Sequence, residues 1–209
     1  RPRDRGHELV PPTPKPTALD YGPSLEQLAA VNVPALHARD IRGQGVRIAI
    51  IDAGFNWTDH AAFAHLQVVA ARDFINDDDD VGDEALEPVT GREATHGQNE
   101  HGTAVLGVLA GNDPGQLIGV APAAEYLLAK TDDVSPSTTT VDESELPIEE
   151  DRWVAALEWA DSLGAQVVNS SLGYNRFDDG TGYDYSDLDG ATALTTRAAE
   201  LAVARGIVI

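Results

Sequence analysis

The sequence contains no cysteine and no methionine, only two lysines, and no long apolar run. The absence of cysteine excludes disulfides, thiol nucleophiles and thiolate zinc sites. No segment approaches the roughly 18 consecutive apolar residues of a membrane-spanning helix, so we expect no transmembrane segment. Basic residues are scarce: 14 Lys and Arg against 35 Asp and Glu give a formal net charge of −21. Such a field repels phosphate backbones and anionic lipid, so we expect no nucleic-acid partner and no membrane partner.

The length and composition fit one globular domain. With 209 residues and 42% hydrophobic side chains, the chain is long enough to bury a sizeable core and too apolar for wholesale disorder. Six of its twelve prolines fall within residues 1–23. Because proline fixes φ and lacks an N–H donor, we expect residues 1–23 to form an extended leader or linker and residues 24–209 to form the domain. The chain starts at Arg1, so we also expect it to be part of a longer open reading frame.

Segments typical of strands and helices alternate along the chain. A β-branched run at 46–51 with a single polar residue predicts a strand covered on both faces. A helix that starts at Ser24, with Gln27 as its capping partner, should kink or split at Pro34. The alternation predicts an α/β fold with a doubly wound, mostly parallel sheet that is incomplete at the C-terminus. The remaining expected elements are strand 67–74, helix 104–111, strand 124–131, helix 151–163, strand 165–170, helix 191–205 and a strand that starts at Ile207.

Two polar residues occupy positions where an α/β sheet can hold a catalytic site. Asp52 comes directly after strand 46–51, at the carboxyl end of the sheet. It is either a turn aspartate that accepts backbone N–H bonds or a catalytic carboxylate. His101 precedes helix 104–111 and is either a helix cap or a general base, because the positive end of the helix dipole disfavours the imidazolium. The residues alone leave both alternatives open.

A metal-dependent site is a further alternative. His96 and His101 lie five residues apart, about 140° around a helix, whereas zinc hydrolases place two histidines four residues apart on one face. Gly97 also weakens a helix at this point. We therefore expect no zinc site here, and chelation would test a metal-dependent hydrolase that uses Asp52, His96 and His101.

Three segments together resemble the subtilisin-like serine proteases, the subtilases. The residues of these segments resemble those of the family, and so do the order of the segments along the chain and their positions on strands and helices. The resemblance covers residues 24–209, which would be the N-terminal part of a peptidase domain. The three segments are Gly43-Gln-Gly-Val-Arg-Ile-Ala-Ile-Ile-Asp-Ala-Gly54, His101-Gly-Thr-Ala-Val-Leu-Gly107 and Val168-Asn-Ser-Ser-Leu-Gly173.

The resemblance implies an Asp–His–Ser triad in that chain order, which is the order of the triad in subtilisin itself. Asp52 would orient the histidine, and His101 would be the base that takes the serine proton. Ser171, Leu172 and Gly173 would form the backbone strand that pairs with an extended peptide. The substrate would accordingly be a polypeptide, and Lys130 would lie near its upstream side.

The family pattern also implies residues that this chain does not contain. The oxyanion-hole Asn would follow the strand that begins at Ile207, and the nucleophilic Ser would come later. We therefore expect no acyl-enzyme from this chain alone and a serine endopeptidase from the complete protein. The alternative is a catalytically inactive relative that binds peptides. Ala53 replaces the Thr or Ser usual in the family, so we expect one hydrogen bond to the Asp52 carboxylate to be missing.

Acidic residues concentrate in three loops, at 77–84, 142–151 and 178–189. Calcium needs six to eight oxygen ligands, which such loops could supply, but Ala62 stands where many subtilases carry an aspartate ligand. We interpret the loops as a solvated acidic surface, expect no required cofactor, and retain calcium as a structural ion as the alternative. The family and the proline-rich residues 1–23, placed where a pro-segment boundary would be expected, predict a secreted protein, and no oligomeric state is predicted.

Overall fold

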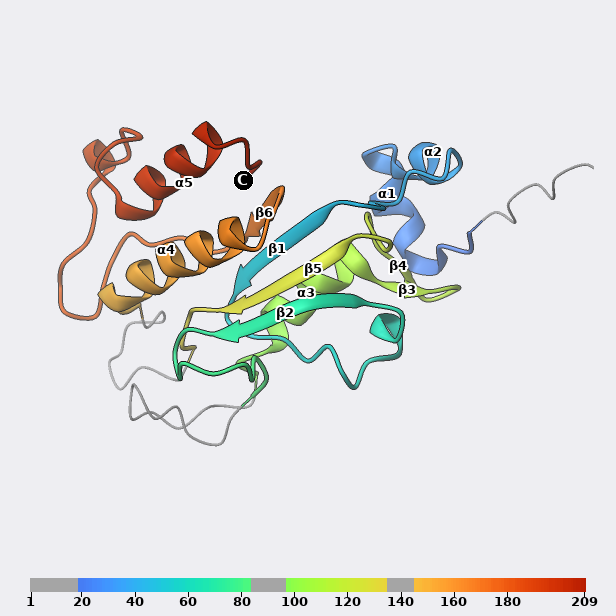
Figure 1. The fold of residues 1–209 in the computed structure, drawn as a ribbon, viewed down its shortest axis with the longest axis horizontal. Coiled ribbons are helices and arrows are strands. Elements are labelled where there is room, and N and C mark those ends of the chain that lie inside the picture. The colour runs from blue at the N-terminus through green and yellow to red at the C-terminus, as the bar shows by residue number, and fades with distance from the viewer. Residues whose placement is uncertain (1–18, 84–96, 135–144) are drawn as a thin grey trace, which may run out of the picture.

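Four parallel strands form the central sheet, in the order β2-β5-β1-β6 (Figure 1). The computed structural model describes residues 19–83, 97–134 and 145–209. All four carboxyl ends meet at one edge of the sheet, where parallel sheets place their functional side chains. The strands are β1 (Arg47–Asp52), β2 (Gln67–Asp73), β5 (Glu125–Lys130) and β6 (Val167–Ser170).

Helices cover both faces of the sheet and create two apolar cores. Strand β1 contributes to both, because successive side chains of a strand point to opposite faces. Ala49 and Ile51 belong to the core on the α4 side, whereas Ile48 and Ile50 belong to the core on the α3 side. The apolar run of β1 is therefore buried on both faces, and the predicted α/β fold with a parallel sheet is confirmed. The helices are α3 (Glu100–Ala110) on one face, with α4 (Pro147–Ser162) and α5 (Leu194–Ala204) on the other (Figure 1).

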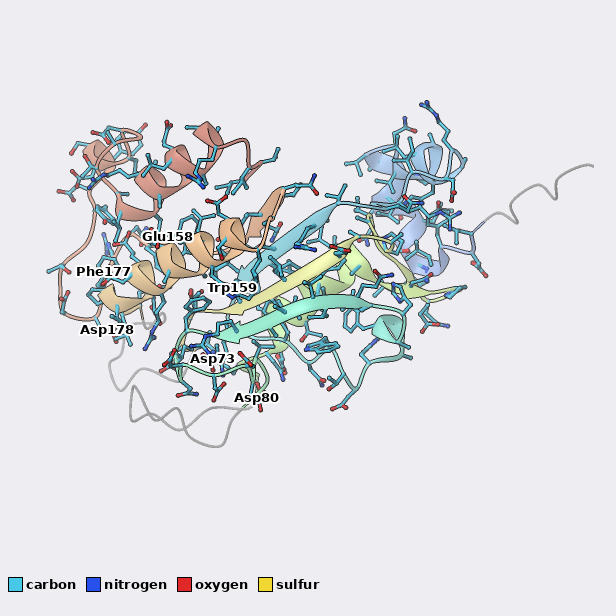
Figure 2. All side chains as sticks on the ribbon, viewed as in Figure 1. Asp73, Asp80, Glu158, Trp159, Phe177 and Asp178 are labelled. Atoms are coloured by element: carbon cyan, nitrogen blue, oxygen red, sulfur yellow. The ribbon has the colours of Figure 1, made fainter. Side chains whose placement is uncertain are left out.

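The core on the α4 side reaches the carboxyl end of β2. Trp159 on α4, labelled in Figure 2, meets Phe74 edge to face, with ring centroids 6.0 Å apart. Phe74 directly follows β2, so this contact fixes the end of the edge strand against the helix layer. Within the described ranges, no helix is long and apolar enough to cross a bilayer.

The elements expected from the sequence are present within four residues of their predicted bounds. The kink or split predicted at Pro34 is confirmed as a split, because Pro34 lies in the first turn of a separate helix and Asn32 before it has a left-handed φ of 62°. Val208 forms a parallel bridge with Val167, in agreement with the strand predicted to start at Ile207. The two short helices are α1 (Leu25–Ala30) and α2 (Val33–His37).

The predicted cap between Ser24 and Gln27 is wrong. Ser24 ends a 3-10 turn, Gly22–Ser24, and its side chain makes no cap. Its hydroxyl donates to the Tyr21 carbonyl at 2.6 Å and accepts from the Ile118 N–H at 3.1 Å. Ser24 thus joins the N-terminal helices to a hairpin that the sequence did not predict, because strands of two residues show no period. That hairpin is β3 (Asn112–Asp113) and β4 (Leu117–Ile118).

The predicted leader, residues 1–23, is described only from Leu19 onward, and residues 1–18 lie outside the described residues. Leu19 and Tyr21 pack against a small core that includes Leu28. The Tyr21 ring stacks on His37 with centroids 5.8 Å apart, and its hydroxyl is hydrogen-bonded to His37 Nδ1 at 3.0 Å. Residues 19–23 are therefore packed onto the domain.

Candidate active site

Asp52 and His101 meet at the carboxyl edge of the sheet. Asp52 ends β1, and His101 is the second residue of α3. His101 Nδ1 lies 2.7 Å from Asp52 Oδ1. The Asp52 side chain is fully buried, whereas that of His101 is 54% exposed. Since Nδ1 makes the ring's hydrogen bond to the described residues, Nε2 is left to face a substrate or solvent.

Two glycines allow α3 to approach β1 this closely. A Cβ atom on Gly102 would overlap the Gly54 carbonyl oxygen and lie 3.0 Å from Asp52 Oδ1. Gly54 itself has a φ of 150°, and a Cβ atom there would lie 3.3 Å from Cα of Asn99, the residue before α3, and 3.0 Å from the Val81 carbonyl oxygen. Glycine at both positions is therefore a steric condition for the contact between Asp52 and His101. The sequence motif contains Gly102, but only the packing of α3 against the end of β1 shows why a larger residue does not fit there.

The Asp52 carboxylate is bonded through one oxygen. Oδ1 accepts from His101 and also from the Ala53 N–H at 2.8 Å. Among the described residues, the buried Oδ2 atom has no hydrogen-bond partner. This agrees with the expectation that Ala53 cannot supply a hydroxyl. Burial raises the pKa of Asp52, and the hydrogen bonds from His101 and Ala53 act in the opposite direction.

Ser171, Leu172 and Gly173 follow β6 at the same edge. Ser170 is in register with Ile51, so Ser171 leaves the sheet beside Asp52. Ser171 is exposed and its Oγ accepts from Asn169 Nδ2 at 3.1 Å, while Leu172 packs against the core on the α4 side. The three residues are thus exposed or half-buried next to the Asp52–His101 pair. Their role in peptide binding stays a prediction.

Among the described residues, no serine hydroxyl is hydrogen-bonded to His101. The Ser170 hydroxyl accepts from Trp153 Nε1 at 2.8 Å. Ser162 donates to the Trp159 carbonyl at 2.7 Å, and Ser24 is committed to the contacts described above. The described part of the chain therefore supplies an aspartate and a histidine but no hydroxyl in place for attack.

The exit of β5 carries buried acids that the sequence did not predict. Asp132 is 7% exposed, Glu149 1% and Glu150 5%, so the interpretation of loop 142–151 as a solvated surface is wrong at Glu149 and Glu150. The reason is local: the Glu149 carboxylate accepts from the Leu146 N–H at 2.7 Å and from the Asp133 N–H at 3.1 Å. The pKa of Asp132 is raised to about 6 and that of Glu149 to about 8, mainly by burial, and a neighbouring carboxylate contributes to each rise.

Lys130 makes a second buried polar contact at this edge. Its Nζ lies 3.0 Å from Asp73 Oδ2 at the end of β2 and donates to the Gly82 carbonyl at 3.1 Å. Both side chains are fully buried. The ammonium group of Lys130 is thus engaged by the neighbouring strand and loop, and its expected place near the upstream side of a substrate stays a prediction.

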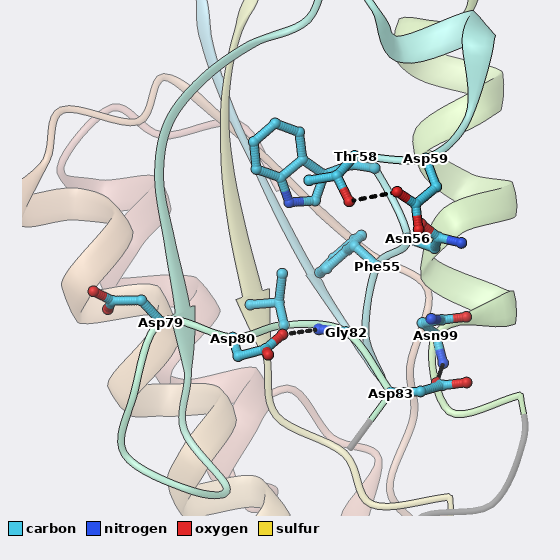
Figure 3. Close-up of a pocket in the computed structure, with 11 residues that line it drawn as sticks. Phe55, Asn56, Thr58, Asp59, Asp79, Asp80, Gly82, Asp83 and Asn99 are labelled. Atoms are coloured by element: carbon cyan, nitrogen blue, oxygen red, sulfur yellow. Dashed lines mark hydrogen bonds between the residues drawn. The ribbon is translucent and has the colours of Figure 1, made fainter. Parts of the chain in front are cut away.

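The acidic loop after β2 borders an open pocket of about 560 Å³ beside the start of α3 (Figure 3). Asp59, Asp79, Asp80 and Asp83 contribute to its lining, and Asp83 Oδ1 accepts from the Asn99 N–H at 2.8 Å. No three acidic or histidine side chains of the described residues gather closely enough to hold a metal ion. His96, part of the alternative metal site, lies outside the described residues, as do 84–96 and 135–144 of the acidic loops.

Comparisons with curated proteins find serine proteases. The major intracellular serine protease of Bacillus subtilis (strain 168) is 30% identical over 123 residues, which are 58% of this chain and 35% of that protein. Subtilisin Savinase of Lederbergia lenta is 29% identical over 147 residues, 70% of this chain and 44% of that protein. The chain thus spans less than half the length of either relative.

Solved structures of proteases share the fold. Fervidolysin from Fervidobacterium pennivorans matches with a TM-score of 0.56 and 24% identity over 91% of this chain and 25% of its own. The MycP3 protease from a type VII secretion system gives the same TM-score and identity over 91% of this chain and 47% of its own. A family model described as the subtilase family matches residues 43–208. The expected resemblance is confirmed, and this chain belongs to the subtilase family.

Proposed function

We propose that the chain carries the Asp and His of an Asp–His–Ser triad in a serine endopeptidase. Asp52 and His101 are the two members, and a serine following Ile209 is the third. The observation that carries this proposal is the 2.7 Å contact between His101 Nδ1 and a fully buried carboxylate, with the rest of the imidazole half exposed. The partial coverage of the relatives supports a nucleophile outside these 209 residues.

The chemistry follows from which nitrogen faces the carboxylate. With Nδ1–H donated to Asp52, Nε2 carries the lone pair and can take the proton of an attacking serine hydroxyl. The imidazolium that forms is stabilised by the ionised Asp52 and then returns its proton to the leaving amine. Asp52 stays ionised throughout and fixes both the tautomer and the ring orientation.

The substrate is a polypeptide bound in extended form. Ser171 to Gly173 leave the sheet beside Asp52, and an extended backbone at such an edge can pair with a peptide through main-chain hydrogen bonds. Hydrolysis by this route moves a proton and an acyl group between side chains and water, so it requires no cofactor. Calcium is proposed only as a structural ion.

Secretion is proposed on the family and on the proline-rich residues 1–23. One relative is intracellular by its name, so the location needs its own test. Detection of the protein in the culture medium rather than in the cell fraction would support secretion, and retention in the cell would refute it.

The test uses the complete protein and a fluorophosphonate probe, which labels activated serines. We expect labelling and peptide hydrolysis by the wild type and loss of both in His101→Ala. His65→Ala is the matched control, because His65 is hydrogen-bonded to the Pro122 carbonyl at 3.0 Å, away from Asp52. Full activity of His101→Ala would refute the proposal. Peptide binding without labelling in the wild type would instead support the non-catalytic alternative.

A further inference from the structure

The fully buried side chain of Gln98 joins three segments at the active edge. Gln98 lies three residues before His101. Its Nε2 donates to the Ala53 carbonyl at 2.7 Å and to the Asp132 carbonyl. Its Oε1 accepts from the Val134 N–H at 3.0 Å. One amide thus ties the loop that leads to His101 to the end of β1 and to the exit of β5.

A second buried contact continues this network towards Ser171–Gly173. Tyr174, the next residue along the chain, donates its hydroxyl to Asp132 Oδ1 at 2.7 Å. The Thr131 hydroxyl donates to the same oxygen at 2.7 Å. Asp132 therefore accepts from the β6 exit through its carboxylate and from Gln98 through its carbonyl. The exits of β1, β5 and β6 are held in one hydrogen-bonded set.

The hydrogen bonds of Gln98 and Asp132 fix the positions of these backbone segments more narrowly than apolar packing can. Hydrophobic contact is non-directional, whereas a hydrogen bond fixes donor and acceptor within a few tenths of an ångström and within a narrow angle. A fully satisfied buried network is correspondingly rigid. Gln98 meets this condition with three bonds to backbone groups, so its amide fixes the backbone on both sides of the Asp52–His101 pair.

We propose that Gln98, Asp132 and Tyr174 are positioning residues of the proteolytic site. Gln98 holds the segment that carries His101 against the end of β1, and so sets the orientation of the imidazole. The hydrogen bond between Tyr174 and Asp132 holds the peptide-binding strand at a fixed distance from the β5 exit. This inference rests on the proposed function and assigns two separable effects, one on the chemical step and one on substrate binding.

Kinetics of the complete protein on a chromogenic peptide separate the two effects. Gln98→Met keeps the length of the side chain and removes its hydrogen bonds, so we expect kcat to fall by about tenfold to a hundredfold while KM stays within about twofold. Gln166→Met is the control, because Gln166 Oε1 accepts from the Arg47 N–H at the opposite end of β1. We expect Gln166→Met to leave kcat and KM unchanged.

Tyrosine variants test the binding effect. Tyr174→Phe removes only the hydroxyl, and we expect KM to rise by about fivefold while kcat is kept. The control is Tyr126→Phe, because Tyr126 is a buried tyrosine that donates to the Ala121 carbonyl at the amino end of β5. Asp132→Asn keeps an acceptor for Tyr174 and should retain a KM close to that of the wild type, whereas Asp132→Ala should behave like Tyr174→Phe.

A spectroscopic readout keeps the inference testable if hydrolysis is absent. In proton NMR, the downfield Nδ1 proton of His101 should shift or broaden in Gln98→Met and stay unchanged in Gln166→Met. Unchanged kinetics in both Gln98→Met and Tyr174→Phe, or an unchanged His101 signal, would overturn the inference. A wild type that escapes the fluorophosphonate probe would refute the proposed function instead, so the two failures are distinguishable.

Discussion

Lys130 and Asp73 form an ion pair in which both side chains are fully buried, 3.0 Å apart. Replacing Lys130 with methionine preserves most of the side-chain volume but leaves the Asp73 carboxylate without its cation and Gly82 without a donor. Removing one partner of a buried pair costs about 3–5 kcal/mol, because the remaining charge stays desolvated. We therefore expect Lys130→Met to lower the free energy of unfolding by about that amount.

The assay is urea unfolding of the complete protein in a His101→Ala background, which prevents self-digestion if the protein is proteolytic. Arg72→Met is the matched control, since Arg72 pairs with Asp77 and Asp79 at the surface and such pairs contribute about 1 kcal/mol at most. The double variant Lys130→Met with Asp73→Asn should recover part of the loss, because no charge is then left buried. Equal stability of Lys130→Met and Arg72→Met would refute the reasoning.

Three further predictions concern the active edge. Gly102→Ala should reduce kcat/KM by about a hundredfold or more, because the added Cβ atom forces α3 away from Asp52. Gly107→Ala in the same helix should keep kcat/KM, since its Cβ atom would lie 3.4 Å from the Leu117 side chain, an ordinary van der Waals contact. The pKa of Glu149 rises from 4.5 to about 8 in the fold, so the unfolded chain loses this proton at lower pH than the folded chain. The free energy of unfolding should therefore fall as the pH rises from about 4.5 to about 8. Urea midpoints should fall less over this range in Glu149→Gln than in the wild type, and an equal fall would contradict the assignment. EDTA should leave the initial rate of hydrolysis unchanged even if a structural calcium is removed, and a loss of activity that zinc restores would favour the metal-dependent hydrolase.

The sheet and the order of its elements along the chain could be predicted because the central strands β1 and β5 are buried on both faces. The run 46–51 is almost continuously apolar, and only a strand between two helix layers needs such a pattern. The same run placed Asp52 at the carboxyl edge. His101 could be placed beside Asp52 only through the resemblance to the subtilases, because the residues alone left it as either a helix cap or a general base.

Other features could not be predicted because they depend on tertiary contacts between distant residues. Ser24 has the sequence of a helix cap, but its hydroxyl bonds to Ile118, which is 94 residues away. Glu149 belongs to an acidic run typical of a surface, yet it is buried, and there it accepts from the N–H groups of Leu146 and Asp133. Gln98 carries no motif of its own, so only the structure shows its three hydrogen bonds.

The Glu149 carboxylate has a consequence for how this region can change during evolution or engineering. It binds the N–H groups of Asp133 and Leu146, and so it fixes both ends of the intervening segment. Closing a longer segment between fixed ends costs only about 0.6 kcal/mol for each doubling of its length. We therefore expect that a change in the length of the chain between Val134 and Leu146 leaves the β5 exit and the start of α4 in their places, because the bonds at both ends are kept.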